Sequence, residues 1–372
     1  MNRSPYDVAI IGEDASGLAA AYALSHAGRR VVVITAPAPP LECALAEWTP
    51  AALFLLPQLP PGLARAVKAV PFQRVRYLNA ALDKQAESSG RATAGYLLPG
   101  GALRAALAAA ARAAGAKFVP LAQTPAVEPH EDGVCIHHAG REVQAKVALL
   151  TAAAPAEALQ RLAFQAVGLL SEPPHAAAVE VPLPGKLARQ SPIVLTLVEP
   201  QHREDTILFF QVGGLLHLRL IRRSARPIGL EELAQVLDGL QQAGLAPGPL
   251  PAPKALSAIW SPPAGVAMEM LTHVARRSLL AGPAGGFADF ITAQTLLPGV
   301  SSALTAAQVI HHSLSERDPQ VALAAFDDAW QGLLARKLAP PSTPLSLLLP
   351  LVFVNSKILA RFTAAVLRGQ DI

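Results

Sequence analysis

Residues 6–35 decide the fold, and they read Tyr6-Asp-Val-Ala-Ile-Ile-Gly-Glu-Asp-Ala-Ser-Gly-Leu-Ala-Ala-Ala-Tyr-Ala-Leu-Ser-His-Ala-Gly-Arg-Arg-Val-Val-Val-Ile-Thr35. The apolar run Val8–Ile11 is short and partly β-branched, which is typical of a buried parallel strand. It stops at Gly12, and the Ala-rich segment that begins at Gly17 has a high helix propensity. A second buried strand is predicted at Val31–Ile34. A strand, a glycine turn, a helix and a strand within about thirty residues predict the βαβ unit that binds a dinucleotide.

The turn between strand and helix keeps the first and third glycines of the GxGxxG fingerprint, Gly12 and Gly17. The middle glycine normally lets the backbone approach a pyrophosphate. Asp14 stands there instead, and a carboxylate beside a diphosphate is unfavourable unless it points away. Thr35 takes the place of the acid that normally holds the ribose, and is a weaker partner. The residues expected at a dinucleotide are Gly12, Asp14, Ala15, Ser16, Gly17 and Thr35. The alternative is a Rossmann-type scaffold whose pocket is no longer filled.

The composition points to a large folded protein without a nucleic-acid partner. The chain has 372 residues, of which 52% are hydrophobic and 16% charged, enough for two domains or for one large domain with an inserted sheet. The net charge of +4 forms no basic run, so nucleic acid is not expected. No run of about eighteen apolar residues predicts a membrane span. With no signal peptide at the start, the cytoplasm is the expected location.

Cysteine and histidine form no metal or hydrolase motif in the sequence. Cys43 and Cys135 lie far apart and make no CxxC, which argues against a thiol metal site and a disulfide framework. The neighbouring pairs His137-His138 and His311-His312 are predicted in a strand and a helix, where adjacent side chains point in different directions. No metal ion is therefore expected. Gly-x-Ser-x-Gly is absent, so covalent hydrolysis is unsupported.

The middle of the chain changes from alternating strands and helices to consecutive strands. Residues 172–270 are expected to form an antiparallel sheet, and residues 1–171 and 271–340 one discontinuous Rossmann-type α/β domain. Strands are predicted at Phe72–Asn79, Lys117–Val119, Gly133–His138, Glu142–Val147, Ala148–Thr151, Ala176–Val181, Ile193–Val198, Thr206–Gln211, Leu215–Leu220, Ala255–Trp260, Val266–Met270 and Ser278–Ala281. Helices are predicted at Thr49–Phe54, Ala102–Ala114, Leu230–Gly244, Gly299–Ser315 and Pro319–Leu338.

This order of elements resembles the flavoproteins that include p-hydroxybenzoate hydroxylase and the geranylgeranyl reductases. The resemblance extends to about Leu338 and is carried by the N-terminal βαβ unit and by three later segments, Tyr96–Gly115, Gly133–Thr151 and Leu279–Ala307. In this group an antiparallel substrate sheet interrupts an FAD domain. The run Leu280-Ala-Gly-Pro-Ala-Gly-Gly-Phe287, followed by Pro298-Gly299 at the start of a long helix, resembles the second flavin motif of the group.

The resemblance implies FAD as the cofactor and adds six residues that would lie against it, four of them glycines whose backbone N–H groups would face it. The helix that begins at Gly299 would point its positive end at the same place. Three positions depart from the group: Pro283 replaces an Asp, the run Thr151–Ala154 replaces Gly-Ala-Asp-Gly, and Pro-Gly replaces an Arg near Tyr96. A loop that only turns the chain is the alternative. The added residues are Gly282, Pro283, Gly285, Gly286, Pro298 and Gly299.

Two functions follow from these features. The first is an FAD-dependent oxidoreductase acting on a hydrophobic substrate, such as an isoprenoid, lipid or aromatic compound, with no catalytic residue identifiable. The second is a flavoprotein-like scaffold that has lost FAD and acts in binding or assembly. A cysteine lies beside the flavin in geranylgeranyl reductases near the position of Cys43, for which an inert thiol is the alternative. The apolar tail, residues 341–372, is expected to pack on the body, form an interface, or rest on a membrane surface.

Overall fold

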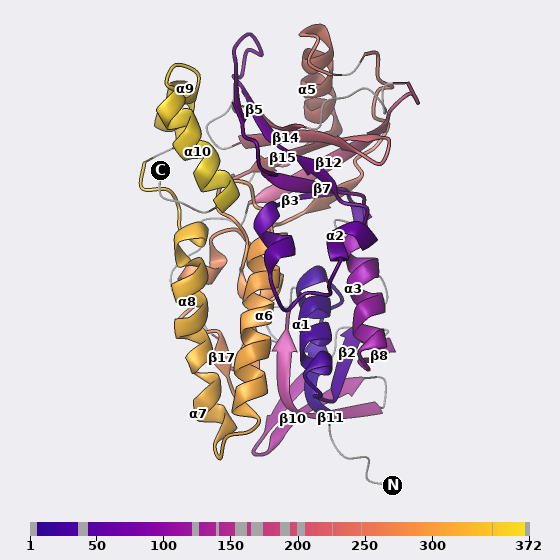
Figure 1. The fold of residues 1–372 in the computed structure, drawn as a ribbon, viewed down its shortest axis with the longest axis vertical. Coiled ribbons are helices and arrows are strands. Elements are labelled where there is room, and N and C mark those ends of the chain that lie inside the picture. The colour runs from indigo at the N-terminus through magenta and orange to yellow at the C-terminus, as the bar shows by residue number, and fades with distance from the viewer. Residues whose placement is uncertain are drawn as a thin grey trace.

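The computed structural model describes residues 6–35, 44–120, 126–138, 141–152, 162–164, 174–186, 194–198, 205–224, 226–246, 248–343 and 345–368. Cys43, with its expected place beside a flavin, lies outside these residues. The elongated molecule carries a helix-covered sheet in its lower half and a second sheet in its upper half (Figure 1). The expected α/β class, a Rossmann-type domain with an inserted antiparallel sheet, is confirmed.

The lower sheet joins both ends of the chain. Its strands run in the order β17–β18–β11–β1–β2–β8. The N-terminal half of β11 also pairs with β10, and β10 pairs with β9. Parallel β18 pairs with β11, and β11 pairs with β1, so the return segment lies one strand away from the N-terminal strand, as expected. The strands are β1 (Tyr6–Ile11), β2 (Val31–Thr35), β8 (Lys117–Pro120), β9 (Ala126–His130), β10 (Gly133–His138), β11 (Arg141–Leu150), β17 (Val274–Ala275) and β18 (Ser278–Leu280).

Helices cover one face of this sheet, and the β9–β10 hairpin lies on the other side. The central strand β1 is buried on both faces, which explains its unbroken apolar sequence. Val8 and Ile10 face the helices, where Leu24 and Trp330 complete the core. Ala9 faces the opposite cluster. The helices are α1 (Ala15–His26), α2 (Leu63–Ala66), α3 (Ala102–Ala113), α6 (Leu296–Ser313), α7 (Pro319–Leu323) and α8 (Ala325–Leu338).

The upper sheet has the order β16–β12–β15–β14–β13–β5–β6. Two strands come from residues 74–89, which the sequence placed in the Rossmann domain: β5 pairs in parallel with β13 and brings β6 with it. Residues 266–270 were expected to be a strand and are mostly a 3₁₀ turn, because left-handed Gly265 turns the chain and Met268 stays exposed. The strands are β5 (Arg74–Leu78), β6 (Gln85–Ser89), β12 (His175–Pro182), β13 (Val194–Val198), β14 (Asp205–Val212), β15 (Leu215–Arg222) and β16 (Ala258–Trp260).

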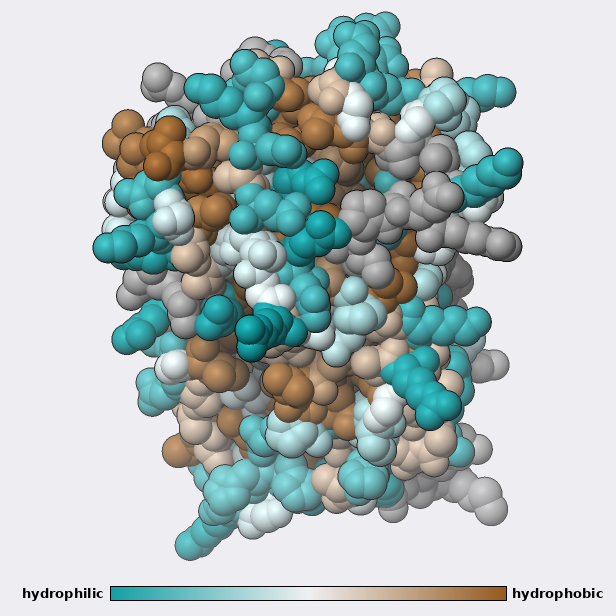
Figure 2. Space-filling view, turned by 45° about the horizontal axis from the view of Figure 1, so that its top comes forward, coloured by the Kyte–Doolittle hydropathy of each residue, from teal (hydrophilic) through white to brown (hydrophobic). Residues whose placement is uncertain are grey.

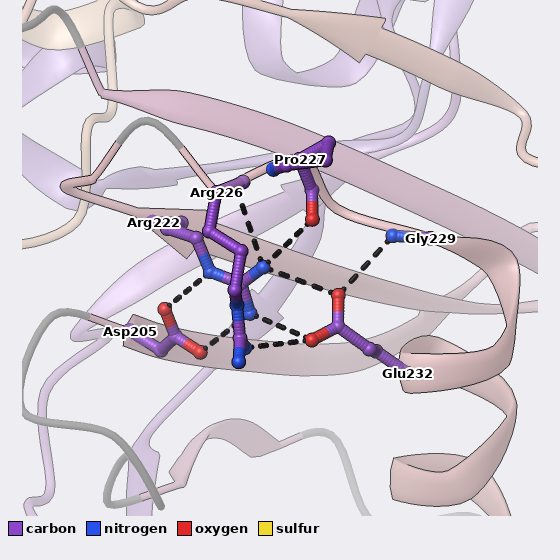
Figure 3. Close-up of polar contacts among 6 residues, drawn as sticks. All are labelled: Asp205, Arg222, Arg226, Pro227, Gly229 and Glu232. Carbon is purple, nitrogen blue, oxygen red and sulfur yellow. Dashed lines mark hydrogen bonds and ion pairs between the residues drawn. The ribbon is translucent and has the colours of Figure 1, made fainter.

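A buried arginine ties this sheet to α5 (Leu230–Gln242) (Figure 3). Arg222 is 1% exposed and forms a two-pronged ion pair with Asp205, at 2.8 and 2.9 Å. Its other N–H groups reach Glu232 and the carbonyl of Pro227. The hydrogen bonds that Arg222 donates to Asp205, followed by those to Glu232, raise the pKa of Arg222 despite its burial. Since the guanidinium is fully satisfied, this network is structural and offers nothing to a ligand.

A small sheet of β3 (Glu47–Pro50), β7 (Gly95–Leu98) and β4 (Val70–Phe72) lies at the junction of the two halves (Figure 1). The helix expected at Thr49–Phe54 forms only as a 3₁₀ turn over Ala51–Leu55, because Thr49 and Pro50 pair with β7. Gln294 donates a 3.1 Å hydrogen bond to the carbonyl of Trp48, which links this sheet to the segment before α6.

The C-terminal tail forms α9 (Leu345–Val352) and α10 (Ser356–Arg368), which pack against the upper sheet. Tyr77 and Thr363 share a buried 3.0 Å hydrogen bond, and Phe362 stacks edge-on against Tyr77. Three apolar side chains on α9 and in the turn after it stay exposed: Leu347, Leu351 and Val354. Figure 2 shows a hydrophobic patch at its upper left, where α9 lies. Within the described residues, no helix has the length and apolar character that crossing a membrane requires.

Candidate functional site

Asp14 closes the N-terminus of α1 with its own side chain. Its carboxylate accepts hydrogen bonds from the backbone N–H groups of Ser16 at 3.2 Å and Gly17 at 3.4 Å, and from the hydroxyl of Thr151 at 2.6 Å. Beside a bound dinucleotide this carboxylate is expected to point outward. It points inward instead, because the first N–H groups of a helix lack partners within the helix and Asp is a favourable N-cap residue.

The N–H groups that Asp14 occupies are those that an anion at this helix end would use. The carboxylate therefore takes the position that the βαβ unit offers to a phosphate. Glu13 adds a second acid to the turn and pairs with Arg104 of α3 at 3.1 Å. The Asp14 carboxylate is itself the anion at this turn, and a phosphate could use the same N–H groups only if the Asp14 side chain rotated away.

The two glycines of the turn serve close packing, as the fingerprint predicts. A Cβ atom at Gly17 would lie 2.5 Å from the carbonyl oxygen of Gly12 and 2.5 Å from the Thr151 hydroxyl. The N–H of Gly12 donates to the carbonyl of Ile34 at 3.2 Å, which joins the turn to β2. Ala15 packs at the start of α1, and buried Thr35 ends β2. This part of the predicted site is one compact unit.

The second group of predicted residues lies against the first. Gly282, Pro283 and Gly285 form a 3₁₀ turn that Gly286 ends, and a Cβ atom at Gly282 would lie 2.8 Å from the Cβ of Ser16. A Cβ at Gly299 would meet the same serine, 2.7 Å from its hydroxyl oxygen. The structure thus brings the two glycine-rich segments together on Ser16.

Backbone N–H groups of the second segment already have partners within the chain. Gly282 donates to the Ser302 hydroxyl at 2.9 Å, Gly286 to the carbonyl of Pro283 at 3.1 Å, and Gly299 to that of Thr295 at 2.8 Å. α6 begins at Leu296, three residues before the expected start, so Pro298 and Gly299 lie inside its first turn rather than at its exposed end. The expected helix start at Gly299 is therefore wrong.

A polar cluster that the sequence did not reveal lies where the small sheet meets the upper sheet. Arg219 on β15 pairs with Glu47 on β3 at 3.0 Å and lies over the ring of Trp260. His217, two residues earlier on the same face of β15, contacts Glu180 on β12 at 3.2 Å. We call Glu47, Glu180, His217 and Arg219 the junction cluster.

Burial sets the protonation of the junction cluster. His217 is fully buried, and burial lowers its pKa to about 4 although Glu180 works against this change. The ring is therefore neutral at pH 7 and donates its Nδ1–H to Glu180. Burial raises the pKa of Glu180, but hydrogen bonds from His217 and the Ala46 N–H, with the charge of Arg219, hold it below its usual value. Glu180 is thus an ionised acceptor.

Two buried polar atoms of the junction cluster, His217 Nε2 and Arg219 Nε, find no partner among the residues that the structure describes, and Trp48 Nε1, on the residue after Glu47, is also unpaired. With Nδ1 donating, His217 Nε2 is an acceptor, whereas the Arg219 and Trp48 nitrogens are donors. Unpaired buried polar atoms are costly and call for an explanation. The only sequence signal was a His and an Arg alternating in the apolar run Leu215–Ile221, where a simple core strand was the obvious interpretation.

No protein-family model and no curated protein matches the sequence. Solved structures match its fold. A geranylgeranyl bacteriochlorophyll reductase-like protein from Thermoplasma acidophilum aligns with a TM-score of 0.71 and 16% identity, over 99% of this chain and 93% of the other. A p-nitrophenol 4-monooxygenase from Pseudomonas putida gives 0.69 and 16%, over 97% and 94%. A variant of the halogenase PltM in complex with FAD gives 0.65 and 14%, over 90% and 74%. The chain therefore has the fold that these reductase-like, monooxygenase and halogenase structures share.

Proposed function

We propose that the chain is an FAD-dependent oxidoreductase that acts on an apolar molecule carrying a hydroxyl group. The observation that carries this proposal is the group of unpaired buried polar atoms at the junction cluster, which lies between the two halves of the fold. A solved structure with this fold contains FAD. When bound, FAD supplies the hydride chemistry, and the protein supplies position and the exclusion of water.

Part of the predicted site fits FAD as it stands, and part needs one side-chain movement. The close approach of Gly17 to Gly12, and of Gly282 to Ser16, is the packing that a nucleotide cradle needs. In the proposed holoprotein the helix N-terminus at Ala15–Gly17 holds the pyrophosphate, with Thr35 beside the ribose and the 282–286 turn beside the flavin. Asp14 has to release the Ser16 and Gly17 N–H groups first, because a carboxylate and a phosphate repel each other.

The junction cluster supports a hydroxyl as the polar group of the substrate. A hydroxyl donates to an acceptor such as His217 Nε2 and accepts from a donor such as Arg219 Nε, which a ketone or a hydrocarbon cannot do together. The surroundings are apolar and include Trp48, Phe210 and Trp260. An isoprenoid alcohol, a lipid alcohol or a phenol therefore matches this environment.

The inward position of Asp14 also favours a second candidate function. Asp14 accepts from the N–H groups that a phosphate would use, and Gly282 donates to Ser302. These groups therefore do not need FAD as a hydrogen-bond partner. A protein without FAD would keep the fold and use the junction cluster to bind a ligand or assemble with a partner, without redox chemistry.

The flavin content of the purified full chain separates these two functions. We expect a flavin absorption band, or uptake of added FAD, with FAD released on denaturation. The band should shift on adding an isoprenoid alcohol, and shift less with the hydrocarbon of the same length or in Arg219→Met. A protein without flavin that takes up none would overturn the oxidoreductase, and alcohol binding that persists there would favour the second function.

A further inference from the structure

The outer face of the β9–β10–β11 sheet gathers four side chains with metal-binding chemistry. Strand pairing sets Glu128 opposite Cys135 on one side, and Glu142 opposite His137 on the other. Cys135 and His137 are two residues apart and therefore share this face, whereas Val134 and Ile136 point into the core. β10 and β11 lie at the lower end of the molecule (Figure 1), away from the junction of its two halves.

The distances within this group match the needs of one ion. One ligand atom each from Cys135, His137 and Glu142 lie within 4.8 Å of one another. His137 Nδ1 is 3.6 Å from a Glu142 carboxylate oxygen, close to the separation of about 3.3 to 3.6 Å between two ligands of a tetrahedral zinc ion. Glu142 is largely exposed and free to rotate toward the others.

Glu128 completes the arrangement from the other side of the imidazole. Its carboxylate lies 3.0 Å from His137 Nε2. A histidine that binds a metal through one nitrogen usually donates the N–H of the other to a carboxylate, which fixes the tautomer and the ring orientation. With Glu128 at Nε2, the nitrogen that faces Glu142 and would bind the ion is Nδ1.

We propose that Cys135, His137 and Glu142 bind a divalent metal ion of the zinc type, with Glu128 as the positioning residue for His137. A thiolate, an imidazole and a carboxylate are the donor set of zinc, and three protein ligands leave a fourth position open to water. On binding, the Cys135 thiol releases its proton to solvent and its sulfur bonds to the ion. Cys135 is 4% exposed, so the ion reaches it from the side of the exposed carboxylates.

The absence of a CxxC motif does not exclude a metal site at this group. Glu142 and Glu128 come near Cys135 only because three strands pair in this register, which a search for CxxC cannot detect. An ordinary ion-pair cluster is the competing interpretation, and the chain offers a matched control for it. His312 near the end of α6 and Glu316 just beyond it form an exposed pair at 3.3 Å, without a cysteine.

Cobalt(II) titration of the full chain tests the proposal, because cobalt in a zinc site with a thiolate ligand shows a sulfur-to-metal charge-transfer band. We expect one equivalent of cobalt to produce this band and zinc to displace it. Cys135→Ser should abolish the band, and Glu128→Gln should weaken binding by about tenfold or more. Cys43→Ser and His312→Gln should leave both the band and the affinity unchanged.

Two results would overturn the site. One is the absence of a charge-transfer band in the wild-type protein when it is fully reduced. The other is a band that survives in Cys135→Ser but disappears in Cys43→Ser. Circular dichroism of each variant establishes that it is folded, and Glu142→Gln serves as a second ligand variant should Cys135→Ser fail to fold. Flavin content plays no part in these readouts, so they stand apart from the proposed function.

Discussion

The hydroxyl of Thr151 donates a 2.6 Å hydrogen bond to the carboxylate of Asp14, and the same carboxylate caps α1. The end of the β11 segment is thereby fastened to the start of the first helix. We expect Thr151→Val to lower the free energy of unfolding by about 1.5 to 3 kcal/mol, the range for a hydrogen bond to a charged group. Urea unfolding measures it. Thr305→Val, which removes a hydroxyl bonded within its own helix, should cost less; equal losses would contradict the assigned role of Thr151.

Gly17→Ala should destabilise the protein through a backbone clash. The added Cβ would meet the carbonyl oxygen of Gly12 at 2.5 Å, and a backbone atom cannot move aside as a flexible side chain can. We expect a loss of about 1 to 3 kcal/mol, typical of overpacking. Gly332→Ala in α8 is the control, because nothing lies within 4 Å of its Cβ. It should raise stability by about 0.5 to 1 kcal/mol. Thermal unfolding of the two variants gives the comparison, and a stable Gly17→Ala protein would refute the close approach.

His217 should make stability fall as the pH drops from about 6.5 to 4. Its folded pKa of about 4 lies below the unfolded value, so in this window the unfolded chain binds the extra proton. Above this pH range the His217 imidazole is neutral in both the folded and the unfolded chain, and below it the imidazole is protonated in both. The loss integrates to roughly 3 kcal/mol. The free energy of unfolding measured across this range should lose that slope in His217→Gln and keep it in exposed His312→Gln. A slope unchanged in His217→Gln would contradict the buried neutral imidazole.

Arg222→Met should be far more damaging than Arg226→Met. The first change leaves buried Asp205 without its cation, whereas the side chain of Arg226 is half-exposed and pairs with Glu232. Breaking a buried pair by removing one partner costs about 3 to 5 kcal/mol, and exposed pairs contribute about 0 to 1 kcal/mol. Chemical denaturation of both variants checks the difference. Similar losses would mean that the Arg222 network does not anchor α5.

The parts of the fold that local pattern controls could be predicted from the sequence. The run Val8–Ile11, the turn at Gly12 and the strand at Leu279 each carry their own signal, and they lie in one sheet. The pairing of β5 with β13 could not be predicted, because parallel pairing between distant segments leaves no local mark. The sequence also shows the glycines of the first turn without fixing where the side chain of Asp14, which lies between Gly12 and Gly17, points. The unpaired N–H groups at the start of α1 decide that orientation.

The junction cluster was hidden for a related reason. In the sequence, Glu47 and Glu180 are isolated charges. The register of β12 with β15 places Glu180 beside His217, and the position of β3 places Glu47 beside Arg219. The metal-binding group at Cys135 depends in the same way on the pairing of three strands. Polar residues that alternate within an apolar strand are the one sequence feature that both places share.

The most direct test of the account is a titration of FAD, followed by flavin fluorescence, into flavin-free wild-type protein and Asp14→Gly. If Asp14 competes with the pyrophosphate for the N–H groups of Ser16 and Gly17, wild type binds FAD and Asp14→Gly binds it about fivefold more tightly, which corresponds to ~1 kcal/mol at a helix N-terminus. Glu13→Gln, which alters the acid paired with Arg104, should change the affinity less. No binding by wild type, and none gained by Asp14→Gly, would contradict the account.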